Sequence, residues 1–174
     1  TLAAYSRAGD TFRFYEINPA VLRFAEQNFT FLSGATGRVE VIMGDARLSM
    51  EREAPQQYDV LVLDAFSSDA IPAHLLTRES FEIYLRHLKT NGVIAAHISN
   101  RHLDLLPVME NHAAQFGLAT VFVIQDTVNQ PWYVLPSQWF LHQIGLGRQQ
   151  RPHAILLQGP APSRKPDSRE EMRC

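Results

Sequence analysis

Acidic side chains stand at the ends of three successive strand-like segments. Glu16 stands near the end of the first segment, Asp45 follows the second, and Asp64 follows the third. The carboxyl ends of parallel strands meet at one edge of a sheet, where helix N-termini and loops converge and ligands bind. Neighbouring carboxylates attract cations and accept protons or hydrogen bonds, so these three residues predict a shared anionic pocket for a positively charged ligand.

The first two acids each have two interpretations. Glu16, with Asn18 beside it, stands where nucleotide-binding domains keep an acid for the ribose hydroxyls. Alternatively, it is a solvated acid ahead of a helix, whose dipole favours the charge. At Gly44, Asp45 and Ala46 the backbone could pass close to an adenine, and the Asp45 carboxylate would then accept a hydrogen bond from the exocyclic amine of that base. Alternatively, Asp45 only caps the helix that follows.

Asp64 comes directly after the apolar run 60–63. We expect this carboxylate at the floor of a cleft, where partial loss of solvent is costly without a cationic or hydrogen-bonding partner. The loop that follows carries Ser67, Ser68 and a second acid, Asp69. Two carboxylates on one short loop can hold a protonated amine, a sulfonium or a metal.

Other residues that could do chemistry fit structural roles better. His97 and His102 have no third ligand at a metal-binding spacing, so His97 is interpreted as a satisfied strand histidine and no metal is expected. The two loop serines lack the Gly-x-Ser-x-Gly context of a hydrolase nucleophile. Trp132, Tyr133 and Trp139 are expected to pack in the core or at its rim, with Tyr133 alternatively lining an amine pocket.

Strands and helices alternate along the chain, which predicts a doubly wound α/β fold with a mainly parallel sheet. The run 58–63 is typical of a strand covered on both faces. The expected strands are 11–17, 38–43, 58–63, 93–99 and 118–124, with an antiparallel return over 132–141. One expected helix starts at Pro19 and has an apolar face that extends to Leu32. The other expected helices are 46–53, 81–88, which Asn91-Gly92 stops, and 106–116.

Composition narrows the class of protein. The chain of 174 residues is 45% hydrophobic, enough for one domain over 1–144, followed by an irregular or disordered tail over 145–174. The chain has 16 basic and 18 acidic residues, and the basic residues form no run before the far C-terminus. No nucleic acid partner is therefore expected. One cysteine fits a reducing, cytoplasmic compartment, and no apolar stretch reaches the roughly 18 residues of a membrane span.

Several motifs together resemble the polyamine aminopropyltransferases, and in particular a bacterial spermidine synthase-like branch. The resemblance covers about residues 1–125 and is most specific over 64–77. The motifs are Tyr15-Glu16-Ile17-Asn18-Pro19, Gly44-Asp45-Ala46, Tyr58-Asp59-Val60-Leu61-Val62-Leu63-Asp64, the loop 64–77, and His97-Ile98-Ser99-Asn100-Arg101.

The resemblance implies a Rossmann-like class I methyltransferase fold that binds decarboxylated S-adenosylmethionine, transfers its aminopropyl group to a polyamine such as putrescine, and releases methylthioadenosine. Glu16 would hold the ribose, and Asp45 with Ala46 the adenine. Asp64 would orient and deprotonate the amine, and Asp69 would bind it. Some members of the branch carry a membrane-embedded region before this domain, and a homodimer is a further expectation for partners.

Some features depart from the family pattern. The chain opens at Thr1 without the family's glycine-rich turn and the strand before it, so we expect a chain cut at the front and compromised in ligand binding. Ala65-Phe66 lengthens the usual Asp-Ser-Ser-Asp spacing. Two alternatives stay open: a methyltransferase that uses S-adenosylmethionine itself, and a non-catalytic module that binds a nucleoside.

Overall fold

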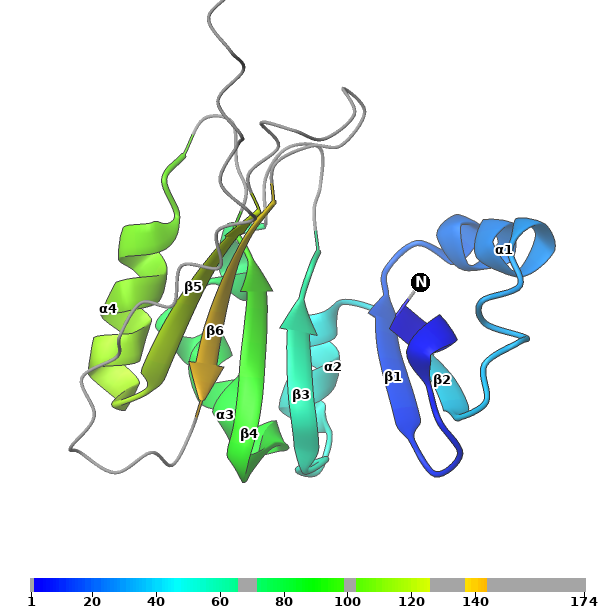
Figure 1. The fold of residues 1–174 in the computed structure, drawn as a ribbon, viewed down its shortest axis with the longest axis horizontal. Helices are drawn as coiled ribbons and strands as arrows, with labels where there is room; N and C mark the ends of the chain where they lie inside the picture. Colours follow the sequence, from blue (N-terminus) through cyan, green and yellow to red (C-terminus); the bar gives the residue numbers. More distant parts are fainter. Residues whose placement is uncertain (1, 66–71, 99–102, 126–136, 144–174) are drawn as a thin grey trace, which may run out of the picture. The chain divides into compact units, whose positions relative to one another are not determined.

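The computed structural model describes residues 2–65, 72–98, 103–125 and 137–143. The chain divides into two compact units that interleave in sequence. The first unit comprises residues 1–57 and 77–88, and the second comprises residues 58–76 and 89–174. Each unit has a sheet of its own, coloured blue to cyan in the first and turquoise to orange-gold in the second (Figure 1). The predicted single domain over 1–144 stays a prediction, and the predicted tail lies outside the described residues.

The first unit is built on two parallel strands. Strands β1 (Thr11–Glu16) and β2 (Arg38–Met43) pair from Thr11 opposite Arg38 to Glu16 opposite Met43, as the sequence predicts. The remaining elements of this unit are the 3-10 turn η1 (Leu2–Tyr5) and the helices α1 (Pro19–Asn28), α2 (Ala46–Arg52) and α3 (Arg78–His87).

Helix α1 begins as the sequence predicts but ends early. Asn18 caps it, because the Asn18 Oδ1 accepts from the amide of Ala20 at 2.9 Å, and Pro19 occupies the first turn. The helix ends at Asn28 instead of reaching Leu32, because the backbone of Phe29 is extended. The predicted apolar face is not buried: Phe29 is 50% exposed, and its ring contacts Phe24 and Phe31.

The core of the first unit lies where α2 packs on α3. The side chains of Met50, Phe81 and Tyr84 are buried, and the two rings meet edge to face at 5.7 Å. Helix α3 ends at His87 and not at the predicted stop, Asn91-Gly92. Leu88, 5% exposed, already has extended backbone, because its burial and the contacts of the last helical turn outweigh the turn signal.

The second unit is built on a four-stranded sheet in the order β3-β4-β6-β5. Strands β3 and β4 point the same way (Figure 1). Strand β6 runs antiparallel to both of its neighbours, which confirms the predicted return for its described residues. The elements are β3 (Tyr58–Leu63), η2 (Ala73–Leu75), β4 (Leu88–His97), α4 (Leu106–Phe116), β5 (Ala119–Gln125) and β6 (Ser137–Gln143).

Burial in the second unit centres on β4 and α4. Ile94 within the interior strand β4, and Ile98 just past its end, are buried, as is Met109 on α4. Helix α4 ends at Gly117, as predicted, and the backbone of this glycine is left-handed. Strand β3 differs from expectation. Val60 is 56% exposed and Val62 on the same face is 37% exposed, whereas Leu61 on the other face is buried, so the prediction of a strand covered on both faces is wrong.

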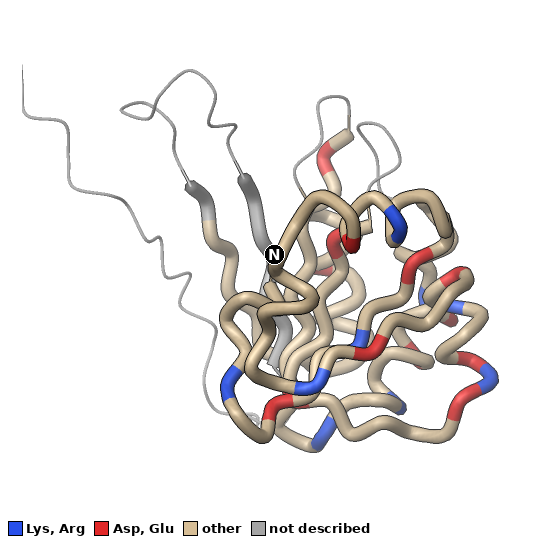
Figure 2. The backbone as a smooth tube through the Cα atoms, turned by 90° about the vertical axis from the view of Figure 1, so that its right-hand side faces the viewer, with Lys and Arg blue, Asp and Glu red and all other residues tan. Residues whose placement is uncertain are grey.

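Charged residues of both signs are interspersed along the described backbone (Figure 2). No long basic stretch interrupts this mixture in the described segments, in line with 16 basic and 18 acidic residues overall. Among the described residues, no helix combines the length and the apolar character that crossing a membrane requires.

Candidate functional site

Glu16 stands at the carboxyl end of β1, held to the neighbouring strand end. Its backbone carbonyl accepts from the amide of Gly44 at 2.9 Å, which joins the ends of β1 and β2. Its carboxylate Oε1 accepts from the amide of Asn18 at 2.8 Å, directly ahead of α1. The side chain is half-buried. The structure therefore brings Glu16, Asn18 and the Gly44-Asp45 turn to one edge of the two-stranded sheet.

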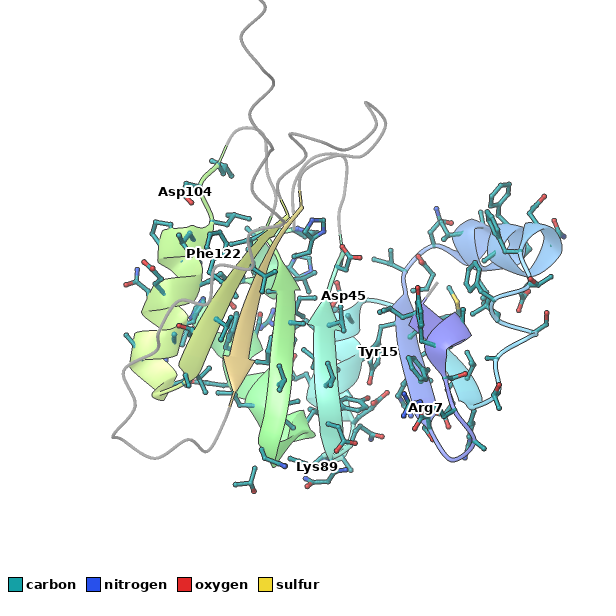
Figure 3. All side chains as sticks on the ribbon, viewed as in Figure 1. Arg7, Tyr15, Asp45, Lys89, Asp104 and Phe122 are labelled. Carbon is teal, nitrogen blue, oxygen red and sulfur yellow. The ribbon has the colours of Figure 1, made fainter. Side chains whose placement is uncertain are left out.

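Asp45 caps helix α2, as one of its two interpretations predicts. Its Oδ1 accepts from the amide of Leu48 at 2.9 Å, at the start of the helix (Figure 3). The preceding Gly44 has φ +141°, and a Cβ there would lie 3.2 Å from the Ser49 hydroxyl oxygen. The turn therefore requires glycine and brings the backbone of Gly44, Asp45 and Ala46 to the sheet edge. Contact with an adenine stays a prediction.

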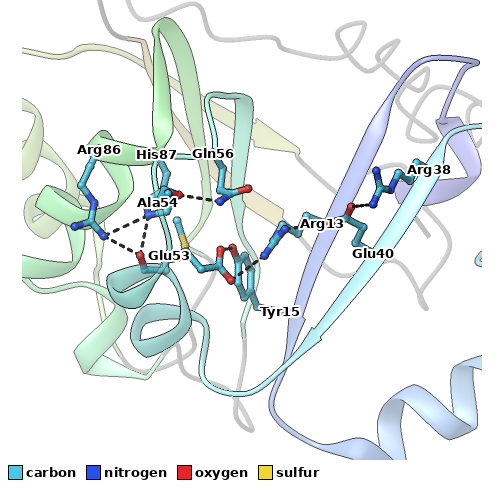
Figure 4. Close-up of polar contacts among 10 residues, drawn as sticks. Arg13, Tyr15, Arg38, Glu40, Glu53, Ala54, Gln56, Arg86 and His87 are labelled. Atoms are coloured by element: carbon cyan, nitrogen blue, oxygen red, sulfur yellow. Dashed lines mark hydrogen bonds and ion pairs between the residues drawn. The ribbon is translucent and has the colours of Figure 1, made fainter.

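A clamp fixes the far end of α2 to the same sheet (Figure 4). Arg13 on β1 donates to Glu53 at 2.8 Å and to Glu40 on β2 at 2.9 Å. The Tyr15 hydroxyl donates to the other carboxylate oxygen of Glu53 at 2.8 Å. Glu53 follows the last residue of α2, so the clamp holds the helix that Asp45 begins against the strand that Glu16 ends.

Helix α3 holds the last turn of α2 from another side. The Arg86 guanidinium donates to the carbonyls of Met50 and Glu51 at 2.8 and 3.0 Å. The His87 Nε2 lies 2.8 Å from the Met50 carbonyl and therefore carries the hydrogen. His87 is fully buried, and burial lowers the pKa of its imidazole below the ordinary value.

In the second unit, Asp64 pairs with His97. The Nδ1 of His97, at the end of β4, lies 2.9 Å from the Oδ1 of Asp64, just past β3. The Asp64 side chain is 51% exposed and that of His97 is 21% exposed. The Asp64 side chain is therefore half open to solvent, and its place at the floor of a cleft stays a prediction. The expected hydrogen-bonding partner of Asp64 is His97, which is, as predicted, a strand histidine with a partner for its ring.

The remaining predicted site residues cannot be compared with the structure. Ser67, Ser68, Asp69 and Tyr133 lie outside the described residues, so their roles stay predictions. In the part of the chain that the structure describes, no three His, Cys, Asp or Glu side chains gather as a metal site would require. The described candidates therefore form two groups: Glu16 with the Gly44–Ala46 turn in the first unit, and Asp64 with His97 in the second.

Two curated relatives match about half of the chain. A polyamine aminopropyltransferase from Vibrio vulnificus is 40% identical over 83 residues, which are 47% of this chain and 27% of the relative. An N-terminal histidine N-methyltransferase from Emericella nidulans is 35% identical over 80 residues, which are 46% of this chain and 14% of that protein. The chain thus spans well under half the length of either relative. No family model matches the chain.

Solved structures show the fold. A spermidine synthase in complex with the transition-state analogue AdoDATO superposes with a TM-score of 0.60 at 17% identity, covering 76% of this chain and 46% of the synthase. A putative O-methyltransferase from Klebsiella pneumoniae superposes with a TM-score of 0.58 at 16% identity, covering 83% and 66%. The chain therefore has a Rossmann-like α/β fold of the class I methyltransferase type, and in sequence it resembles the polyamine aminopropyltransferases.

Proposed function

We propose that this chain contributes to an aminopropyl transfer from decarboxylated S-adenosylmethionine to a polyamine such as putrescine. The observation that carries the proposal is the 40% identity to a polyamine aminopropyltransferase over 83 residues. The half-exposed carboxylate of Asp64 at a strand end supports it, because an incoming amine needs an accessible base. The proposal requires no metal.

The chemistry needs a base for the amine. An alkylammonium with a pKa of about 10.4 must lose a proton before its nitrogen can attack carbon. In the proposed reaction the Asp64 carboxylate takes that proton, and the nitrogen electron pair forms a bond to the carbon beside the sulfonium. The carbon–sulfur bond breaks with its electron pair going to sulfur, which leaves methylthioadenosine. Holding the amine in line with the leaving sulfur supplies much of the rate, and no covalent enzyme intermediate is needed.

The first unit would bind the nucleoside. Glu16 accepts hydrogen bonds from the ribose hydroxyls, beside the Asn18 amide that already donates to it. Asp45 and Ala46 face the adenine, with the Gly44 backbone allowing close approach. This arrangement is supported by the Gly44–Glu16 hydrogen bond of 2.9 Å, which keeps the two strand ends together.

For the amine, the proposed ligands beside Asp64 are Ser67, Ser68, Asp69 and Tyr133. Asp69 would hold the far ammonium of a diamine while Asp64 receives the attacking one. Carboxylates at both ends of the substrate favour a dication over a monoamine, because each ammonium then has a counter-charge. These assignments rest on the family resemblance.

Product analysis tests the proposal. The protein is incubated with putrescine and decarboxylated S-adenosylmethionine, and mass spectrometry follows spermidine and methylthioadenosine. Formation of both in equal amounts supports aminopropyl transfer. The relative from Emericella nidulans favours methyl transfer as the second candidate, so a parallel incubation replaces the cofactor with S-adenosylmethionine. Methylated product together with unchanged putrescine would overturn the proposal, and methylthioadenosine binding without any turnover would indicate a non-catalytic module.

A further inference from the structure

We propose that His97 is a positioning residue for Asp64, whose carboxylate it holds in the orientation that receives the proton of the amine. This inference rests on the proposed function and adds a residue to it. Its basis is the 2.9 Å separation between the His97 Nδ1 and the Asp64 Oδ1. The two residues are 33 positions apart in sequence and meet because β3 and β4 are neighbouring strands.

The two partners differ in how firmly the fold holds them. His97 is the last residue of β4, an interior strand whose other edge pairs with β6, where His97 lies opposite Trp139. Asp64 stands one residue past β3, the edge strand, and its side chain is 51% exposed against 21% for His97. A hydrogen bond from the better anchored residue therefore restricts the rotamers of the more exposed carboxylate.

The direction of the hydrogen bond follows from the chemistry of the two groups. An ionised carboxylate only accepts, so the Nδ1 of His97 carries the hydrogen, and a neutral imidazole in that tautomer suffices. The bond occupies Oδ1. Within the described segments the Oδ2 of Asp64 has no hydrogen-bond partner, so this oxygen is the one available to an ammonium. A fixed acceptor keeps the amine in line for attack.

Two substitutions separate the hydrogen bond that His97 donates from the space that its ring fills. His97→Asn keeps a donor near the place of Nδ1, whereas His97→Phe keeps the ring and removes the donor. Because hydrogen bonds to charged groups are strong, we expect His97→Phe to lower kcat roughly 10- to 100-fold with the KM for the nucleoside cofactor nearly unchanged. His97→Asn should recover most of the loss. Parental kcat in His97→Phe, or equal losses in both variants, would overturn the inference.

A third variant distinguishes the loss of the hydrogen bond from a general folding defect in the substituted protein. His97→Ala leaves a space at the surface, and added imidazole should restore part of its kcat, which a general packing defect would not permit. The absence of any rescue together with a folded circular dichroism spectrum counts against positioning.

Further measurements separate this inference from the proposed function. If the parent protein transfers no aminopropyl group, the proposed function fails while the pairing remains testable by nitrogen-detected NMR of the imidazoles. We expect the His97 Nδ1–H signal to shift on Asp64→Asn. Putrescine affinity by calorimetry should fall in His97→Phe and not in His97→Asn. An unshifted signal, or equal affinities, would contradict the positioning role whether or not the protein is an enzyme.

Discussion

The Asp45 carboxylate accepts a hydrogen bond from the Leu48 amide at 2.9 Å and so begins helix α2. This contact uses Oδ1 and satisfies one of the helix's unpaired amides. The proposed adenine contact asks the same carboxylate for a second task. Structural capping and ligand binding at Asp45 are therefore separable only by a substitution that preserves the cap.

Asp45→Asn and Asp45→Ala separate the two tasks. Asparagine caps a helix about as well as aspartate, so we expect the free energy of unfolding to change by no more than about 0.3 kcal/mol, whereas alanine should cost about 1 kcal/mol. Both substitutions should weaken methylthioadenosine binding roughly 10-fold, because the charged acceptor is lost. Urea unfolding and calorimetry measure these quantities. Parental affinity in Asp45→Asn would leave Asp45 with the capping role alone.

Arg13 should matter more to stability than the neighbouring Arg38. Arg13 is 19% exposed and binds both Glu40 and Glu53. Arg38 is 75% exposed, and Glu40 is its one ion-pair partner among the described residues. Arg13→Met removes the cation shared by two shielded carboxylates, of which Glu40 keeps the exposed Arg38 and Glu53 keeps the Tyr15 hydroxyl. Because a poorly solvated carboxylate is costly without its cation, we expect a loss of about 1–3 kcal/mol in the free energy of unfolding.

Arg38→Met is the matched control, because an exposed ion pair contributes less than about 1 kcal/mol. Chemical denaturation followed by circular dichroism compares the two variants. Equal losses would show that the clamp of Arg13, Tyr15 and Glu53 does not stabilise the fold as described.

His87 should make the fold sensitive to mild acid. Burial lowers the pKa of His87 in the folded chain below its unfolded value of about 6.5. Between those two values the unfolded chain binds more protons, so the free energy of unfolding falls as the pH drops below about 6.5. Below the folded pKa this loss is complete.

His87→Gln tests the histidine's share of that loss. The Gln amide can donate to the Met50 carbonyl in place of Nε2, which lies 2.8 Å from it, but does not titrate. We expect a flatter dependence of unfolding free energy on pH between about 7 and 5 than in the parent. Identical slopes would assign the acid sensitivity to other groups.

Local sequence patterns predicted the strands that carry the site. The ranges Arg38–Met43 and Tyr58–Leu63 match residue for residue, because β-branched runs bounded by glycine, proline or an acid leave little choice of boundary. The positions of Glu16, Asp45 and Asp64 at strand ends followed directly. The end of α3 did not, because contacts with Met50 and Glu51, more than thirty residues away, decide where that helix stops.

The partner of Asp64 was beyond the reach of the sequence for a related reason. Strand order in a sheet depends on tertiary packing, so nothing local showed that β3 and β4 are neighbours and that His97 would meet Asp64. The available signal was that each of these two polar residues follows an apolar run at the same end of its strand. The exposure of Val60 likewise depends on what covers that face of β3, which the composition of the strand does not show.

The most direct test of the account compares Asp64→Asn with Asp59→Asn. Both acids lie on or beside β3, but Asp59 stands at its other end, 78% exposed and paired with Lys89 at 2.6 Å. We predict that Asp64→Asn lowers kcat for aminopropyl transfer at least about 100-fold while methylthioadenosine affinity is kept, and that Asp59→Asn changes neither. Parental turnover in Asp64→Asn, or equal losses in the two variants, would contradict the role of Asp64 as the base.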